Sequence, residues 1–158
     1  MGSNMPFVSR IEARAYSYAT EQIDRVRTAV TNVYAEEIRP DLKIEMTKTK
    51  SHNQVPIVIV SAVLDRKKDC KLTFEYLMTS FPQEDRLEID RTLLERISER
   101  CVLFLRLDKQ EAFLERITLA RGPDIIGVKV YLRQYPRCVL DDAIALVRNQ
   151  LQVSGGQF

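Results

Sequence analysis

Basic and aromatic residues alternate with apolar residues in two segments that lie far apart in the chain. In residues 7–19 and again in residues 126–135, about every second residue is apolar, as in a half-buried strand. The residues between the apolar ones include Arg10, Arg14, Tyr16 and Tyr18 in the first segment and Lys129, Tyr131, Arg133 and Tyr135 in the second. Tyrosine rings stack on bases, and guanidinium and ammonium groups bind phosphates. The pattern predicts RNA contact along two strands.

Two other interpretations of this pattern stay open. Alternating polar residues can simply face water, as on any half-exposed sheet. The tyrosines can also pack against a second protein chain, which would make the protein a homodimeric interaction scaffold. The apolar residues 55–64 favour a homodimer as well, because both faces of that expected strand are apolar and a partner could cover one of them.

A second candidate site is the polar segment 48–54, which we expect to be a loop. It contains Lys48, Lys50 and His52, followed by the amides Asn53 and Gln54. Such side chains can donate hydrogen bonds to phosphate and ribose oxygens. A lysine-bearing loop that is merely solvated would look the same.

A third candidate follows the alternating apolar residues 103–107, where a polar triplet interrupts the apolar pattern. Asp108 can cap a turn with its side-chain oxygen, leaving Lys109 and Gln110 at the end of a strand that carries Arg106. These three residues can bind RNA. The triplet can equally be structural, with Lys109 paired to a nearby carboxylate.

The sequence offers no support for catalysis, a metal or a cofactor. His52 is the single histidine and has no carboxylate near it in the sequence, so a catalytic triad is not indicated. No glycine-rich phosphate loop is present. Cys70, Cys101 and Cys138 are odd in number and far apart, which argues against a disulfide framework and against zinc. An RNA-directed hydrolase is therefore the least favoured function.

Length and composition predict a single domain over residues 1–158. The net charge is only +2, so nucleic-acid binding would depend on where the basic residues lie. No apolar run is long enough for a membrane helix, no signal peptide is evident, and a cytoplasmic location is expected. We expect residues 1–5 to be partly non-native, because Met1–Asn4 precede a second methionine, and residues 154–158 to be a frayed tail.

The expected elements, in chain order, are six strands and four helices. The strands are residues 7–19, 42–47, 55–64, 103–107, 116–120 and 126–135, and the helices begin near Glu21, Lys67, Gln83 and Asp141. Thr20, Asp65 and either Asp141 or Asp142 are candidate helix caps. The order βαββααβββα predicts an α+β fold with a mostly antiparallel sheet and helices on one face.

Three segments of the chain resemble an archaeal family of small predicted RNA-binding proteins regarded as accessory subunits of the RNA exosome. They are Arg106–Gln110 with Ala112 and Phe113, residues 125–130, and residues 18–21. The segment 51–56 departs from the family's glycine-containing loop, although His52 and Pro56 match it. The resemblance implies exosome subunits as partners. The RNA that we expect as ligand is structured or double-stranded. The sequence thus favours a non-catalytic RNA-binding protein.

Overall fold

The computed structural model describes residues 5–18 and 21–152, and in these ranges the chain forms one sheet with helices packed against it. The strands are β1 (Phe7–Tyr18), β2 (Ile44–Lys50), β3 (Pro56–Leu64), β4 (Val102–Asp108) and β5 (Ile125–Arg133). The helices are α1 (Ile23–Thr31), α2 (Lys67–Ser80), α3 (Gln83–Arg91), α4 (Leu93–Arg96), α5 (Lys109–Phe113) and α6 (Leu140–Leu151), with a 3-10 helix, η1 (Arg39–Asp41).

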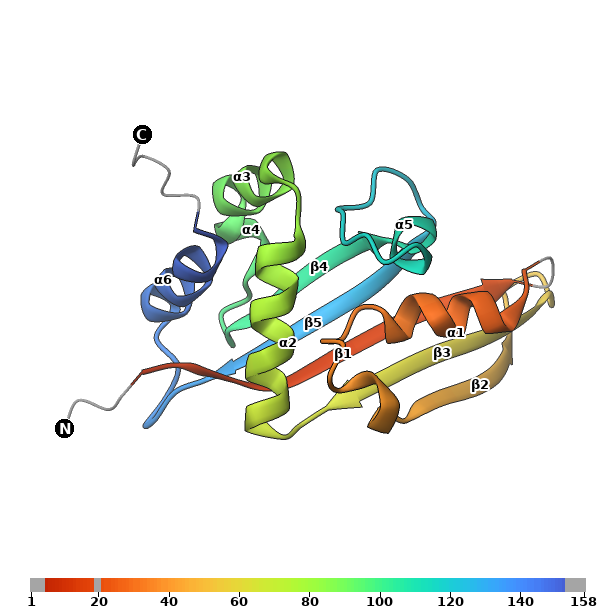
Figure 1. The fold of residues 1–158 in the computed structure, drawn as a ribbon, viewed down its shortest axis with the longest axis horizontal. Helices are drawn as coiled ribbons and strands as arrows, with labels where there is room; N and C mark the ends of the chain where they lie inside the picture. Colours follow the sequence, from red (N-terminus) through yellow and green to blue (C-terminus); the bar gives the residue numbers. More distant parts are fainter. Residues whose placement is uncertain (1–4, 19–20, 153–158) are drawn as a thin grey trace.

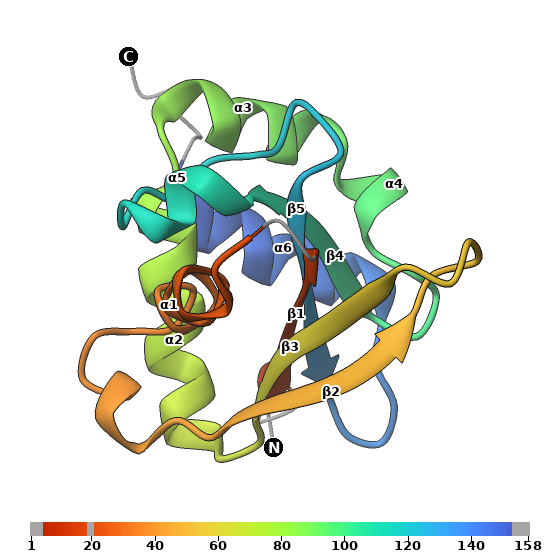
Figure 2. The ribbon, with the colours of Figure 1, turned by 90° about the vertical axis from the view of Figure 1, so that its right-hand side faces the viewer.

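The five strands lie in the order β2-β3-β1-β5-β4, and every neighbouring pair is antiparallel. The helices cover one face of this sheet and leave the other uncovered, as Figures 1 and 2 show from two directions. The alternation in the sequence explains this arrangement, because Ile11, Ala13 and Ala15 of β1 are buried while Arg14 and Tyr16 between them are exposed. The predicted fold class is confirmed.

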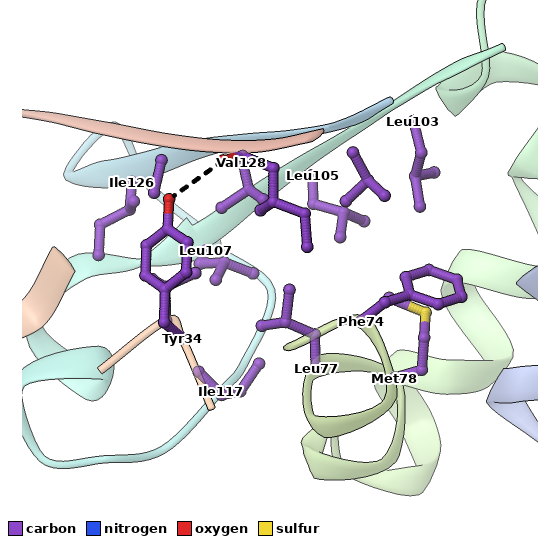
Figure 3. Packing of buried hydrophobic residues seen from close by; sticks show 14 of the residues in the cluster. Tyr34, Phe74, Leu77, Met78, Leu103, Leu105, Leu107, Ile117, Ile126 and Val128 are labelled. Atoms are coloured by element: carbon purple, nitrogen blue, oxygen red, sulfur yellow. Dashed lines mark hydrogen bonds between the residues drawn. The ribbon is translucent and has the colours of Figure 1, made fainter. Parts of the chain in front are cut away.

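The core lies between the sheet and the helices (Figure 3). Leu103, Leu105 and Leu107 of β4 are buried there, and Leu77 of α2 packs into the same cluster. Tyr34 is also fully buried, with its hydroxyl donating a hydrogen bond to the Ala62 carbonyl oxygen at 2.8 Å. Burial raises the pKa of Tyr34 well above its usual range. Its hydroxyl therefore stays neutral and hydrogen-bonded inside the core.

Several predicted element bounds differ from the structure. The strand expected at 116–120 makes a single bridge, between Leu107 and Leu119, because the chain passes the edge of β4 only briefly. The strand expected to end at Thr47 continues to Lys50, and the polar segment beyond it is a shorter turn. Asp108 caps α5 as predicted, since its carboxylate accepts from the Glu111 backbone N–H at 2.8 Å.

Within the described residues, the other predicted helix caps are not observed. Neither Asp65 nor Asp141 or Asp142 caps a helix: α2 begins after Arg66 and α6 after Val139, without side-chain caps from those positions. The Val139 backbone N–H is instead bound by the Gln134 side chain at 2.9 Å. The predicted cap Thr20, residues 1–4 and the tail 154–158 lie outside the described residues.

The prediction against disulfide bonding, made from cysteine number and spacing, was wrong. Cys101, just before β4, forms a disulfide with Cys138, just before α6, while Cys70 is free and buried in α2. The two bonded residues are 37 positions apart in the sequence but have Cα atoms 6.4 Å apart. Spacing along the chain cannot reveal such a pair, because the fold alone brings its members together.

The strand β3 lies inside the sheet but is covered on one face only. Val60, Ala62 and Leu64 face the core, whereas Val63 on the other side is exposed and Ile59 is half-buried. The apolar run therefore did not indicate a strand buried on both faces within this chain. It leaves apolar side chains on the uncovered side of the sheet.

Candidate nucleic-acid interface

The uncovered side of the sheet, which we call the open face, carries most of the residues predicted to bind RNA. Antiparallel partners point to the same side, so the register places these residues together although they come from three strands. The predicted residues on this face are Arg10, Arg14, Tyr16, Tyr18, Arg106, Lys129, Tyr131 and Arg133.

The centre of the open face is a row formed by Arg14, Gly127 and Arg106. Gly127 of β5 is paired with Arg14 of β1 on one side and with Arg106 of β4 on the other. Both arginines are exposed, and within the described part of the chain neither side chain makes a hydrogen bond or ion pair. Two positive charges thus flank a residue without a side chain, and both are available to an anion.

Aromatic rings lie on both sides of this row. Tyr16 follows Arg14 by two residues in β1, on one side of the row. Phe104 precedes Arg106 by two residues in β4, on the other side, where it is paired with Lys129. Tyr16 and Phe104 are each 43% exposed as residues. The Lys129 ammonium lies 5.8 Å from the centre of the Phe104 ring. Cations and rings therefore alternate across the face, which suits a ligand with alternating phosphates and bases.

One end of the open face is an internally paired cluster of Arg10, Glu12 and Tyr131. The Arg10 guanidinium bonds to the Glu12 carboxylate at 2.7 Å, and the Tyr131 hydroxyl donates to the same carboxylate at 3.3 Å. Burial and the neighbouring Glu12 charge raise the pKa of Tyr131. Glu12 offsets the charge of Arg10, so this end attracts anions less than the central row does.

The structure separates the second candidate site from the open face. Lys48 and Lys50 belong to β2, not to a loop, and their partners Val58 and Pro56 place them on the helix side of the sheet. Both lysines are exposed there. His52 lies in the turn of the β2–β3 hairpin (Figure 2). The three residues form a separate basic surface on the hairpin.

The third candidate site is divided between the interior and the surface. Lys109 is only 2% exposed, and its ammonium lies 2.7 Å from the Tyr16 carbonyl oxygen, 3.0 Å from Glu21 and 2.8 Å from Asp124. It is thus fully engaged within the protein and presents no charge to a phosphate. Gln110 is exposed, but its amide donates to Asp124 at 2.9 Å.

The contacts of Asp124 predict how stability changes in acid. Burial alone would raise the pKa of Asp124, but the hydrogen bonds from Gln110 and Lys109 and the Lys109 charge outweigh it and lower the pKa below its ordinary value of 3.8. A lowered folded-state pKa stabilises the protein above that ordinary value, and the contribution is lost as the pH falls through the folded-state pKa.

We therefore expect Asp124→Asn to lose less stability than the parent protein between about pH 5 and about pH 2. Urea unfolding at several pH values measures the difference. Glu84→Gln is a suitable control, because the Glu84 carboxylate is exposed and its contact with Arg121 is long, at 3.5 Å. Parallel acid curves for Asp124→Asn and the parent protein would contradict the expectation.

Phe104 and Gly127, which lie in or beside the central row of the open face, were not among the predicted site residues. Phe104 shares a face with Arg106 by simple alternation, so the strand pattern already contained the signal for it. Gly127 is an isolated glycine inside a strand pattern, which often marks close approach of a backbone or a ligand. A Cβ atom at this position would meet only the Arg14 carbonyl oxygen, at 3.9 Å. The space above Gly127 is therefore open.

Sequence comparison places this sheet in a known family. A family model described as RNA binding matches residues 10–132, a range that includes most of β1 and all of β2, β3 and β4. The chain belongs to this RNA-binding family. Within the described residues, no helix is long and apolar enough to cross a membrane, and no three His, Cys, Asp or Glu side chains are grouped to hold a metal ion.

Individual relatives are archaeal. The chain is 28% identical over 127 residues to RNA-binding protein PAB1135 of Pyrococcus abyssi, covering 80% of this chain and 82% of that protein. It is 28% identical to the structure of AF2318 from Archaeglobus fulgidus, with a TM-score of 0.74, covering 90% and 99% of the two chains. Mth689 from Methanothermobacter thermautotrophicus, a DUF54 protein, is 25% identical with a TM-score of 0.72, covering 92% and 98%.

Proposed function

We propose that the protein binds RNA through its open face and has no catalytic activity of its own. The observation that carries this proposal is the central row, in which the unpaired side chains of Arg14 and Arg106 flank Gly127 with exposed rings on both sides. The family membership supports RNA as the ligand. Phosphate contacts supply the affinity and exposed rings supply stacking, so this surface needs no large net charge.

The first test is the salt dependence of RNA binding. Replacing Arg14 and Arg133 with alanine removes two exposed cations from the open face. We expect weaker binding to a hairpin RNA with an unpaired loop and a flatter log–log plot of affinity against salt. The slope falls by about 0.7 for each lost phosphate contact to a single strand, and by about 0.9 for duplex DNA.

The matched control removes two cations from the other side of the same sheet. Lys48→Ala combined with Lys50→Ala changes the net charge by the same amount. Unchanged affinity in this control, with weaker binding in the first variant, supports the open face. The reverse result would assign RNA binding to the hairpin with Lys48, Lys50 and His52. A parent protein that binds no RNA would overturn the proposal altogether.

A homodimeric scaffold is the second candidate, favoured by the exposed Val63 and the half-buried Ile59 on the open face. In a two-fold dimer the same patch meets itself, so Arg14 and Arg106 of one copy would approach those of the other. Like charges brought together without counter-charges oppose such a contact. RNA fits this face better. Light scattering at increasing protein concentration tests the alternative, which requires a dimer mass.

The cellular setting is a further part of the proposal. From the resemblance in the sequence, we propose an accessory role in RNA processing or degradation, with exosome subunits as partners. We also propose a cytoplasmic location. A stable disulfide such as Cys101–Cys138 is unusual in the cytoplasm, because cytosolic disulfides persist mainly in proteins of hyperthermophilic archaea and bacteria. Co-purification of exosome subunits with the tagged protein, before and after ribonuclease treatment, tests the partnership.

A further inference from the structure

We infer that the open face binds unpaired RNA: one phosphodiester lies over Gly127 between Arg14 and Arg106, and bases stack on Tyr16 and Phe104. This inference rests on the proposed function and names the class of RNA that the same surface takes. The ligand of this face is then a single strand or the unpaired loop of a folded RNA, and not a double helix.

The central row has the geometry of a phosphate site. Neighbouring strands are about 4.8 Å apart, so the Cα atoms of Arg14 and Arg106, two strands apart, are separated by about 10 Å. Two long guanidinium side chains can meet a phosphate from both sides over that span. Gly127 provides no side chain beneath it, and no carboxylate within the described residues pairs with either arginine. The row therefore lacks a negative charge, which a phosphodiester would supply.

The rings on either side require bases that are separated from one another. Tyr16 and Phe104 are two strands apart and four residues apart along the strands, or roughly 16 Å between Cα atoms. Neighbouring bases in a helical stack are only about 3.4 Å apart. Bases that reach both rings must therefore be unstacked from their neighbours, as in an extended single strand or a splayed loop.

A double helix would leave the rings of this face without partners. In A-form RNA the base faces are hidden within the stack, and proteins recognise the duplex through phosphates and 2′-hydroxyls. The exposed Tyr16 and Phe104 rings would then meet only polar sugar and phosphate groups. The structured RNA expected from the sequence remains compatible when the contacted part is an unpaired loop, whereas the double-stranded RNA also expected there does not fit this face.

The test compares three RNAs under one buffer: an unstructured 12-nucleotide strand, the blunt duplex formed with its complement, and a hairpin whose loop has the same sequence. We expect the strand and the hairpin to bind at least about 10-fold more tightly than the duplex. Tyr16→Ala and Phe104→Ala should each weaken binding of the strand by about 5- to 150-fold without changing the salt slope, because stacking releases no counterions.

Conservative variants separate stacking from loss of structure. Tyr16→Phe and Phe104→Tyr keep a ring and should retain the affinity of the parent protein. Gly127→Glu places a carboxylate between Arg14 and Arg106 and should weaken strand binding as much as replacing both arginines, whereas Gly127→Ala, for which there is room, serves as the folding control.

Failure of this inference differs from failure of the proposed function. Equal or tighter binding of the duplex, or unchanged strand affinity in both ring-to-alanine variants, would overturn the unpaired-RNA inference even if Arg14→Ala still weakened binding. If no substitution on the open face changed the RNA affinity, the open face would not be the binding site. Absence of binding to any of the three RNAs would remove the RNA-binding function.

Discussion

Cys138→Ser should lower the free energy of unfolding by about 4 kcal/mol, the largest effect that we expect from a single substitution. The disulfide with Cys101 closes a loop between residues 37 positions apart, and such a loop restricts the unfolded chain. Cys138 is only half-buried, so a serine at that position disturbs little else. Urea unfolding of the oxidised parent protein and the variant, under the same conditions, measures the difference.

Reduction gives the control for this prediction within the same pair of proteins. Adding a thiol reductant should destabilise the parent protein toward the stability of Cys138→Ser and leave the variant unchanged. The remaining cysteine, Cys70, is buried and unpaired, so it does not contribute to the response. If the reductant did not change the free energy of unfolding of the parent protein, and Cys138→Ser did not change it either, the cross-link would be absent.

Lys109→Met should lower the free energy of unfolding by about 2–3 kcal/mol. Methionine keeps the apolar stem but removes the ammonium that binds the Tyr16 carbonyl oxygen, Glu21 and Asp124. Removing one member of a buried ion pair commonly costs about 3 kcal/mol or more. The smaller value is expected here because the side chains of Glu21 and Asp124 are 22% and 44% exposed and remain partly hydrated.

Lys129→Met is the matched control, since it removes the same charge from an exposed position on β5, the strand next to β1. Its unfolding free energy should stay within about 0.5 kcal/mol of the parent value. Chemical denaturation of the three proteins gives the comparison. If Lys109→Met were as stable as Lys129→Met, the buried ammonium would not hold the end of β1 in place.

The sequence alone predicted which side chains of β1, β4 and β5 share a face. In β1 the apolar Ile11, Ala13 and Ala15 alternate with Arg14 and Tyr16, and this local period decides which side packs on the core. The same alternation predicted the antiparallel α+β fold with helices on one side. Asp108 as the cap of α5 was also predictable, because a cap depends only on residues within one turn.

Only the tertiary structure decided which strands are neighbours, and therefore which of these side chains meet. Arg14 and Arg106 flank Gly127 because β5 lies between β1 and β4, an order that no local pattern contains. The chain path likewise buried Lys109 against two carboxylates and joined Cys101 to Cys138. Side-chain alternation is set by the backbone of one strand, whereas pairing depends on contacts between residues far apart in the chain.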